Sequence, residues 1–258
     1  MSGPDLQIGR TWRDGRAGSC RLRFWTIRTL WLVVLACFSA TAIANNGDKV
    51  LTAVAVSPHV YYFQGEAGMA AAANQGFMSN AGFVVTEDGI LVFDALGTPV
   101  LGASMIDAIR KITPRPIKRV IVSPYHADHI YGLQAFKAIG AEVWAHQNGR
   151  AYLKSDVAMA RLAERRASLF PWVDANTRLV PADRWLDFSG DKVIRFVMGG
   201  IRFQLLDVSG AHSDEDIMLL VENDAVLFAG DLYFTGRIPF VGNANSRVWL
   251  TALDTCSK

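Results

Sequence analysis

Short apolar runs rich in Val, Ile and Phe occur near both ends of the chain from Val50 onward, and helical patterns lie between them. Two of these runs, Gly82–Thr86 and Ile90–Asp94, flank Glu87-Asp88-Gly89, and an Asp-Gly pair between β-rich runs is a strong hairpin signal. Further strands are predicted at Val50–Val56, Val60–Phe63, Arg119–Ser123, Glu142–Ala145, Val193–Val197, Ile201–Val208, Ile217–Val221 and Ala225–Phe228. Because antiparallel hairpins predominate in this order, the pattern favours an α/β sandwich over a doubly wound parallel sheet.

Helical patterns occupy four segments. The clearest begins at Leu101, where apolar residues recur every three or four positions as far as Ile112, and Pro114 ends it. The other three are His129–Ile139, which Gly140 closes, Asp156–Phe170 and Ser246–Leu253. The stretch Gly65–Asn80 is rich in Ala, Gly and Asn, and it is predicted to be a mobile loop.

The composition excludes several classes of protein. Of the 258 residues, 51% are apolar and 19% are charged, so the chain is neither disordered nor of low complexity. The first 44 residues hold six Arg, and the remainder is slightly acidic. No basic surface is left to attract phosphates, so nucleic acid is not an expected partner. Only Cys256 lies outside the first segment, so no disulfide is expected in the rest of the chain.

The first 44 residues have the parts of a secretory signal peptide. Arg28 precedes the short apolar run Leu30–Ala36, and small residues lead to Ala42-Ile43-Ala44. The run is too short to span a bilayer, which takes about 20 apolar residues. Cleavage after Ala44 leaves one domain, residues 45–258, with no membrane span and a periplasmic or secreted location. A lipid anchor at Cys37 is the alternative that the sequence leaves open.

Polar side chains that bind metals follow three of the predicted strands. The segments are Ser123-Pro124-Tyr125-His126-Ala127-Asp128-His129, Gly210-Ala211-His212-Ser213-Asp214 and Phe228-Ala229-Gly230-Asp231-Leu232. Taken singly, an Asp after a strand is usually a turn residue and a lone His is usually structural. Loops at strand ends commonly display site residues, and imidazole with carboxylate suits zinc. Together the three segments favour a metal site.

In these segments the sequence resembles the metallo-β-lactamase-fold superfamily of zinc hydrolases, over about Val50–Leu253. The resemblance implies an α/β fold, a four-layer αββα sandwich, here incomplete at its C-terminal end. It assigns His126 and His212 to a first zinc ion, Asp128 and His129 to a second, and Asp231 to a bridge between them. It also assigns Asp94 to a structural role that braces the metal loop.

The function that this resemblance implies is an exported zinc-dependent hydrolase acting on a small-molecule substrate. A metal-activated water would attack an ester, thioester or amide bond, including that of a β-lactam, and Asp128 would orient it and pass on its proton. The segment after Asp231 is most similar to periplasmic members grouped with sulfur oxidation or quinoproteins. No Gly-x-Ser-x-Gly motif is present that would indicate a serine nucleophile.

Two departures from the family pattern predict a weakened metal site. Pro124 stands where the first signature histidine is expected, and none of the 27 residues after Asp231 is a histidine. Each zinc ion would therefore lack one imidazole, and one or two ions would bind weakly. Two alternatives to an impaired hydrolase follow: a metal-poor binding or scaffold protein of the same fold, and a truncated copy of an active enzyme.

Overall fold

The computed structural model describes residues 47–236, 238–242 and 244–255. The predicted signal peptide, with Cys37, and the remaining cysteine, Cys256, lie outside the described residues. Within the described part of the chain, no helix combines the length and the apolar character needed to cross a membrane.

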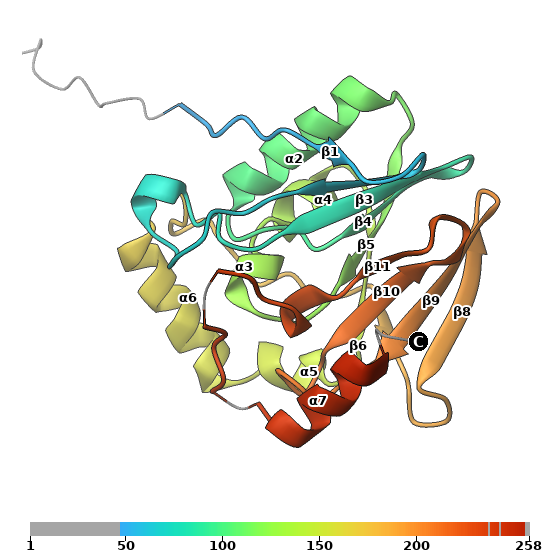
Figure 1. Cartoon of the computed structure of the whole chain (residues 1–258). Helices are drawn as coiled ribbons and strands as arrows, with labels where there is room; N and C mark the ends of the chain where they lie inside the picture. Colours follow the sequence, from blue (N-terminus) through green and yellow to red (C-terminus); the bar gives the residue numbers. More distant parts are fainter. Residues whose placement is uncertain (1–46, 237, 243, 256–258) are drawn as a thin grey trace, which may run out of the picture. The chain divides into compact units, whose positions relative to one another are not determined.

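The described strands form two sheets (Figure 1). The larger sheet has seven strands in chain order: β1 (Val54–Ala55), β2 (Val60–Phe63), β3 (Ala81–Thr86), β4 (Gly89–Phe93), β5 (Ile117–Val122), β6 (Glu142–His146) and β7 (Arg184–Leu186). The smaller sheet has four, in the order β11 (Val226–Phe228), β10 (Ile217–Val221), β9 (Ile201–Asp207) and β8 (Val193–Met198). Strands β1 to β4 pair antiparallel and β4 to β7 pair parallel, whereas the smaller sheet is antiparallel throughout.

Helices connect the strands from β4 to β7, and one further helix, α7, follows the last strand. The α-helices are α2 (Pro99–Ile112), α3 (Ala127–Ile130), α4 (Leu133–Ala138), α5 (Gly149–Leu153), α6 (Asp156–Ser168) and α7 (Ser246–Thr255). Three short 3-10 turns complete the elements: η1 (Ala72–Asn74), η2 (Glu222–Asp224) and η3 (Gly230–Leu232). Helix α2 begins where the side-chain oxygen of Thr98 accepts a hydrogen bond from the Leu101 N–H at 3.2 Å, with Pro99 in the first turn.

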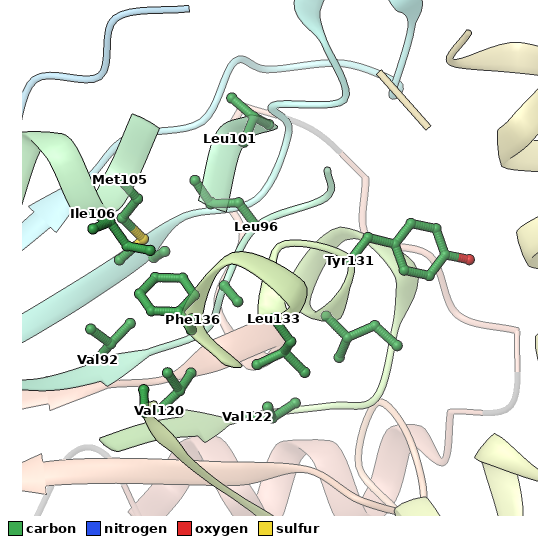
Figure 2. Packing of buried hydrophobic residues seen from close by; sticks show 14 of the residues in the cluster. Val92, Leu96, Leu101, Met105, Ile106, Val120, Val122, Tyr131, Leu133 and Phe136 are labelled. Atoms are coloured by element: carbon green, nitrogen blue, oxygen red, sulfur yellow. The ribbon is translucent and has the colours of Figure 1, made fainter. Parts of the chain in front are cut away.

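Three apolar clusters separate the layers. One lies between the larger sheet and the helices α2 and α4, and Figure 2 shows the Phe136 ring there among side chains of α2, β4 and β5. A second fills the space between the two sheets, where Leu91 and Phe93 meet Phe203 and Leu219. The third lies under α7, on the other face of the smaller sheet. This is the predicted four-layer αββα sandwich.

Most of the sequence predictions for individual elements are confirmed. The hairpin closes with Thr86 paired to Gly89, so Glu87 and Asp88 form a two-residue turn. Gly89 has φ +131°, which requires glycine, and this explains the Asp-Gly signal. Strands β2 and β10 have the predicted bounds, and the other predicted strands shift by one or two residues at an end or, at β1, shorten to two.

The single helix predicted for His129–Ile139 is wrong. Instead α3 ends at Ile130 and α4 begins at Leu133. Gly132 lies between them and packs so closely on another segment that an added Cβ would be 1.8 Å from the carbonyl oxygen of Ala95. The backbone N–H of Ala95 donates to the carbonyl of His129 at 2.9 Å, which holds the segment that carries His129 against the end of β4.

The prediction of a mobile loop at Gly65–Asn80 is wrong in part. The segment contains η1, and the side chain of Phe77 is buried in the main core. Its backbone is tied to other elements, because the indole Nε1–H of Trp172 donates to the carbonyl of Ala72 at 2.9 Å. The Ser79 hydroxyl also donates to the carbonyl of Asp128 at 2.6 Å. These distant partners fix a segment whose local composition indicates flexibility.

Candidate metal centre

The polar residues predicted for the site meet at one edge of the two sheets. Asp94 follows β4, His126 to His129 follow β5, His212 lies in the β9–β10 connection and Asp231 lies in η3 after β11. Strands β4 and β5 are parallel, and β9 and β11 run in the same direction because both pair antiparallel with β10. The backbone N–H of Ile217 donates to the carbonyl of Ser123 at 3.1 Å and joins the loops of the two sheets.

Three of these side chains have the spacing of ligands around one ion. The His126 Nδ1 lies 3.3 Å from the His212 Nε2. Asp231 Oδ2 lies 3.3 Å from that Nε2 and 3.7 Å from the His126 Nδ1. Donor atoms at zinc distances of about 2.0–2.1 Å in a tetrahedral arrangement are about 3.3 Å apart. His126, His212 and Asp231 therefore fit a zinc ion.

The two other predicted ligands lie beside this group. Asp231 Oδ2 is 3.2 Å from the His129 Nε2, and Asp128 Oδ2 is 3.6 Å from the same nitrogen. One oxygen of Asp231 thus faces three imidazoles, from His126, His129 and His212. The five predicted site residues lie together, and Asp231 lies between the two sets.

Buried nitrogen atoms in the cluster lack hydrogen bonds. Among the described residues, neither ring nitrogen of His129 nor the His212 Nδ1 has a partner with hydrogen-bond geometry, and all three atoms are shielded from solvent. Buried polar atoms in folded proteins are nearly always satisfied, and a site for a metal ion is one of the usual reasons for an exception. A cation between His129 and Asp231 would satisfy the His129 Nε2.

The electrostatics of the cluster favour the charged forms of His126, His129 and Asp231. Burial by itself lowers the pKa of His126, but the negative charges of the nearby Asp231 and Asp128 carboxylates raise it overall. Burial is likewise outweighed at His129, where Asp231, Asp94 and Asp128 raise the pKa well above its ordinary value. The pKa of Asp231 is well below its usual range, because its imidazole partners outweigh the effect of burial. The imidazolium and carboxylate groups therefore attract one another, and a bound metal ion would take the place of the imidazolium protons.

Asp94 holds the loop after β5 in the way the sequence predicts. Its Oδ1 accepts the Ser123 backbone N–H and its Oδ2 accepts the Ser123 hydroxyl, both at 2.7 Å. The same Oδ2 lies 2.9 Å from the His129 Nδ1, on the side of the ring opposite Asp231. A carboxylate behind an imidazole fixes the orientation of the ring and is typical of metal-binding histidines.

Asp216, which the sequence analysis missed, holds the loop of His212. Its Oδ2 accepts the backbone N–H groups of His212 and Ser213 at 2.7 and 2.6 Å, and its Oδ1 accepts the Ser213 hydroxyl at 2.7 Å. Burial raises the pKa of Asp216. The Ser-x-x-Asp spacing directly after His212 is the signal that could have identified this turn.

Other unpredicted neighbours line the cluster. The Tyr152 ring of α5 lies edge-on to His126 with centroids 6.4 Å apart, and the Phe234 ring lies 6.2 Å from His212. Glu215 is a buried acid near His126, and burial raises its pKa. No local pattern marks these three residues, because the fold alone brings them to the site.

Pro124 lies in the bend that follows β5, which ends at Val122 rather than at the predicted Ser123. Its side chain is buried and offers no ligand atom. Among the described residues, the candidate ligands of an ion at His126 are therefore two imidazoles and one carboxylate, those of His126, His212 and Asp231.

A family model described as the metallo-beta-lactamase superfamily matches residues 74–257, which include every residue of the cluster. The chain belongs to this superfamily. Membership supports a metal-dependent hydrolase in general, and the superfamily typically binds zinc. A search of curated proteins found no match.

Solved structures of the superfamily share the fold. The metallo-β-lactamase IND-7 is 16% identical with a TM-score of 0.60, and the match covers 81% of this chain and 85% of that one. A metallo-β-lactamase from Pontibacter korlensis is 16% identical with a TM-score of 0.57 over 80% and 84%. The inverting sec-alkylsulfatase Pisa1 from Pseudomonas sp. is 19% identical with a TM-score of 0.57, over 81% of this chain but 36% of its own. At these identities the likeness concerns the fold alone.

Proposed function

We propose that the protein is an exported zinc-dependent hydrolase that cleaves an ester, thioester or amide bond, with β-lactams among the candidate substrates. The observation that carries the proposal is the convergence of three imidazole nitrogens on one oxygen of Asp231, at 3.2, 3.3 and 3.7 Å. Zinc bound there would supply a Lewis acid and a water molecule that ionises near neutral pH.

The ligand sets indicate a weakened site. His126 and His212 would hold one ion, Asp128 and His129 the other, and Asp231 would contact both. Each ion then has one imidazole fewer than in the family pattern that the sequence resembles, and the loss of a direct ligand lowers metal affinity. We expect the affinity for zinc to be low, with one or two ions retained.

Asp128 is the residue we assign to proton transfer. Its side chain is 21% exposed and lies beside the cluster, whereas His129 is almost fully buried. The Ser79 hydroxyl holds the Asp128 carbonyl, and the backbone of Gly97 packs against the Asp128 Cα, so the side chain starts from a fixed position. From there its carboxylate can orient a water molecule and accept its proton.

The decisive experiment measures hydrolysis by the full chain before and after removal of metal. The panel holds 4-nitrophenyl acetate, a chromogenic thioester, nitrocefin and a secondary alkyl sulfate, the last because an alkylsulfatase shares the fold. We expect turnover of at least one member, its loss on chelation and its return with Zn²⁺. Asp128→Asn should lower kcat about 100-fold or more. The exposed Asp107→Asn is the matched control. Turnover that survives chelation would contradict the proposal.

We also propose export to the periplasm or the medium. Support comes from the sequence of residues 1–44, where Arg28, the apolar run Leu30–Ala36 and Ala42-Ile43-Ala44 follow one another.

A further inference from the structure

A pocket of about 510 Å³ lies between α5 and the segment that leads into β7. Its lining comprises two cations and four apolar or aromatic residues: Arg150, Leu153, Lys154, Leu179, Pro181 and Trp185. Leu153, Leu179 and Trp185 pack on the main core, so the floor of the pocket is part of the rigid fold. No carboxylate contributes to the lining.

The two cations of this pocket have no anionic partner among the described residues. The side chains of Arg150 and Lys154 are exposed, and neither forms an ion pair there, whereas the nearby Lys137 pairs with Asp183 at 2.7 Å. The Arg150 guanidinium lies over the Trp185 indole, 5.3 Å from its centroid. A guanidinium placed on an aromatic face keeps its N–H groups free to bind an anion.

The pocket is separate from the metal cluster. Tyr152 faces His126, and a residue two positions away on a helix points about 200° around the axis, so Arg150 and Lys154 face the other side of α5. Tyr125 connects the two places. The centroid of its ring lies 5.7 Å from that of Trp185, and its hydroxyl donates to the Val180 carbonyl at 2.8 Å. The next residue in the chain is His126.

We propose that this pocket is a second ligand site, for a small organic anion with a flat apolar body, such as an aryl sulfonate or carboxylate. The apolar body lies on Leu153, Leu179 and Pro181, and the anionic group meets Arg150 and Lys154 beside Trp185. An apolar ligand alone would leave the two cations without an anion, and an inorganic anion alone would leave the apolar lining without a contact. The proposal does not depend on hydrolysis at the metal cluster.

The test titrates the full chain with naphthalene-2-sulfonate by calorimetry, with inorganic sulfate and neutral 2-naphthol as comparison ligands. We expect the sulfonate to bind about tenfold or more tightly than either comparison ligand. Arg150→Gln and Lys154→Gln should each weaken its binding about fivefold, and the double variant should abolish it. Lys111→Gln, an exposed cation on α2, is the matched control and should bind as the parent does.

Three results would overturn the proposal. Equal affinity for the sulfonate and 2-naphthol in the parent protein overturns the proposal even if the variants fail to fold. Unchanged binding in the folded double variant overturns it as well. A loss of binding in His212→Ala with full binding in the double variant would place the ligand at the metal cluster and also overturn it.

Discussion

Asp94 and Ser123 are joined by two hydrogen bonds of 2.7 Å, one to the backbone N–H and one to the hydroxyl of the serine. The same carboxylate lies 2.9 Å from the His129 Nδ1. One buried side chain at the end of β4 therefore fixes both the start of the loop after β5 and the ring of a candidate ligand. The candidate site depends on this contact as much as on the ligands themselves.

Removing this brace should destabilise the protein. Asp94→Ala leaves the N–H and hydroxyl of Ser123 unsatisfied in the interior, so we expect a loss of about 2–4 kcal/mol in the free energy of unfolding, measured by urea denaturation. Asp107→Ala, at an exposed position of α2, is the control and should change it by less than about 0.5 kcal/mol. Equal effects of the two changes would show that Asp94 has no bracing role.

The strand ends of the site were predictable because polar residues directly follow apolar runs. The bracing by Asp94 was predictable only through the family resemblance, and that of Asp216 was missed although its turn spacing is local. Strand β7 was also missed. Its three residues are held by parallel pairing with β6 and by the Arg184 guanidinium, which lies 4.3 Å from the centroid of the Trp144 ring. Those partners are about forty residues away, beyond the reach of a local pattern.

Composition misled at Gly65–Asn80 for the same reason. The stretch has the residues of a flexible loop, but Phe77 is buried and Trp172 binds the carbonyl of Ala72 from a distant segment. The helix predicted across Gly132 failed because close packing on Ala95 is invisible in the sequence. In each case a tertiary contact outweighs the local preference.

Restoring a histidine at position 124 should strengthen the metal site. Residue 124 lies two positions before His126, and Pro124→His would add an imidazole where the family pattern has one. We expect the zinc dissociation constant to fall about tenfold or more, with a rise in kcat/KM for any substrate found in the panel. Pro114→His, in the connection between α2 and β5, is the matched control. An unchanged zinc affinity in a folded Pro124→His protein would mean that residue 124 does not face the metal.

The stability of the zinc-free protein should depend on pH in a defined direction. The pKa values of His126 and His129 are raised, so their contribution is fully present below about pH 6.5, the ordinary imidazole value. This contribution to the free energy of unfolding is lost as the pH rises through the raised pKa values that the two histidines have in the folded state. Unfolding in urea with chelator present should therefore show a fall in stability above pH 6.5 that is smaller in His126→Gln. A free energy of unfolding that rises steadily from pH 6.5 to pH 9, equally in the parent and in His126→Gln, would contradict the raised pKa of His126.

Export predicts a defined mature N-terminus. If cleavage follows Ala44, N-terminal sequencing of the secreted or periplasmic product should begin at Asn45. A product that retains Arg28 would refute the signal peptide.

The central claim is that His126, His212 and Asp231 hold zinc, and zinc content after equilibrium dialysis tests it most directly. We predict at least one Zn²⁺ per chain in the parent protein and the loss of one ion per chain in His126→Ala and in His212→Ala. His59→Ala is the matched control, because His59 pairs with Asp224 at 2.8 Å and is not part of the cluster, so it should keep the parent content. A parent protein without zinc, or two folded cluster variants that retain the parent content, would contradict the claim.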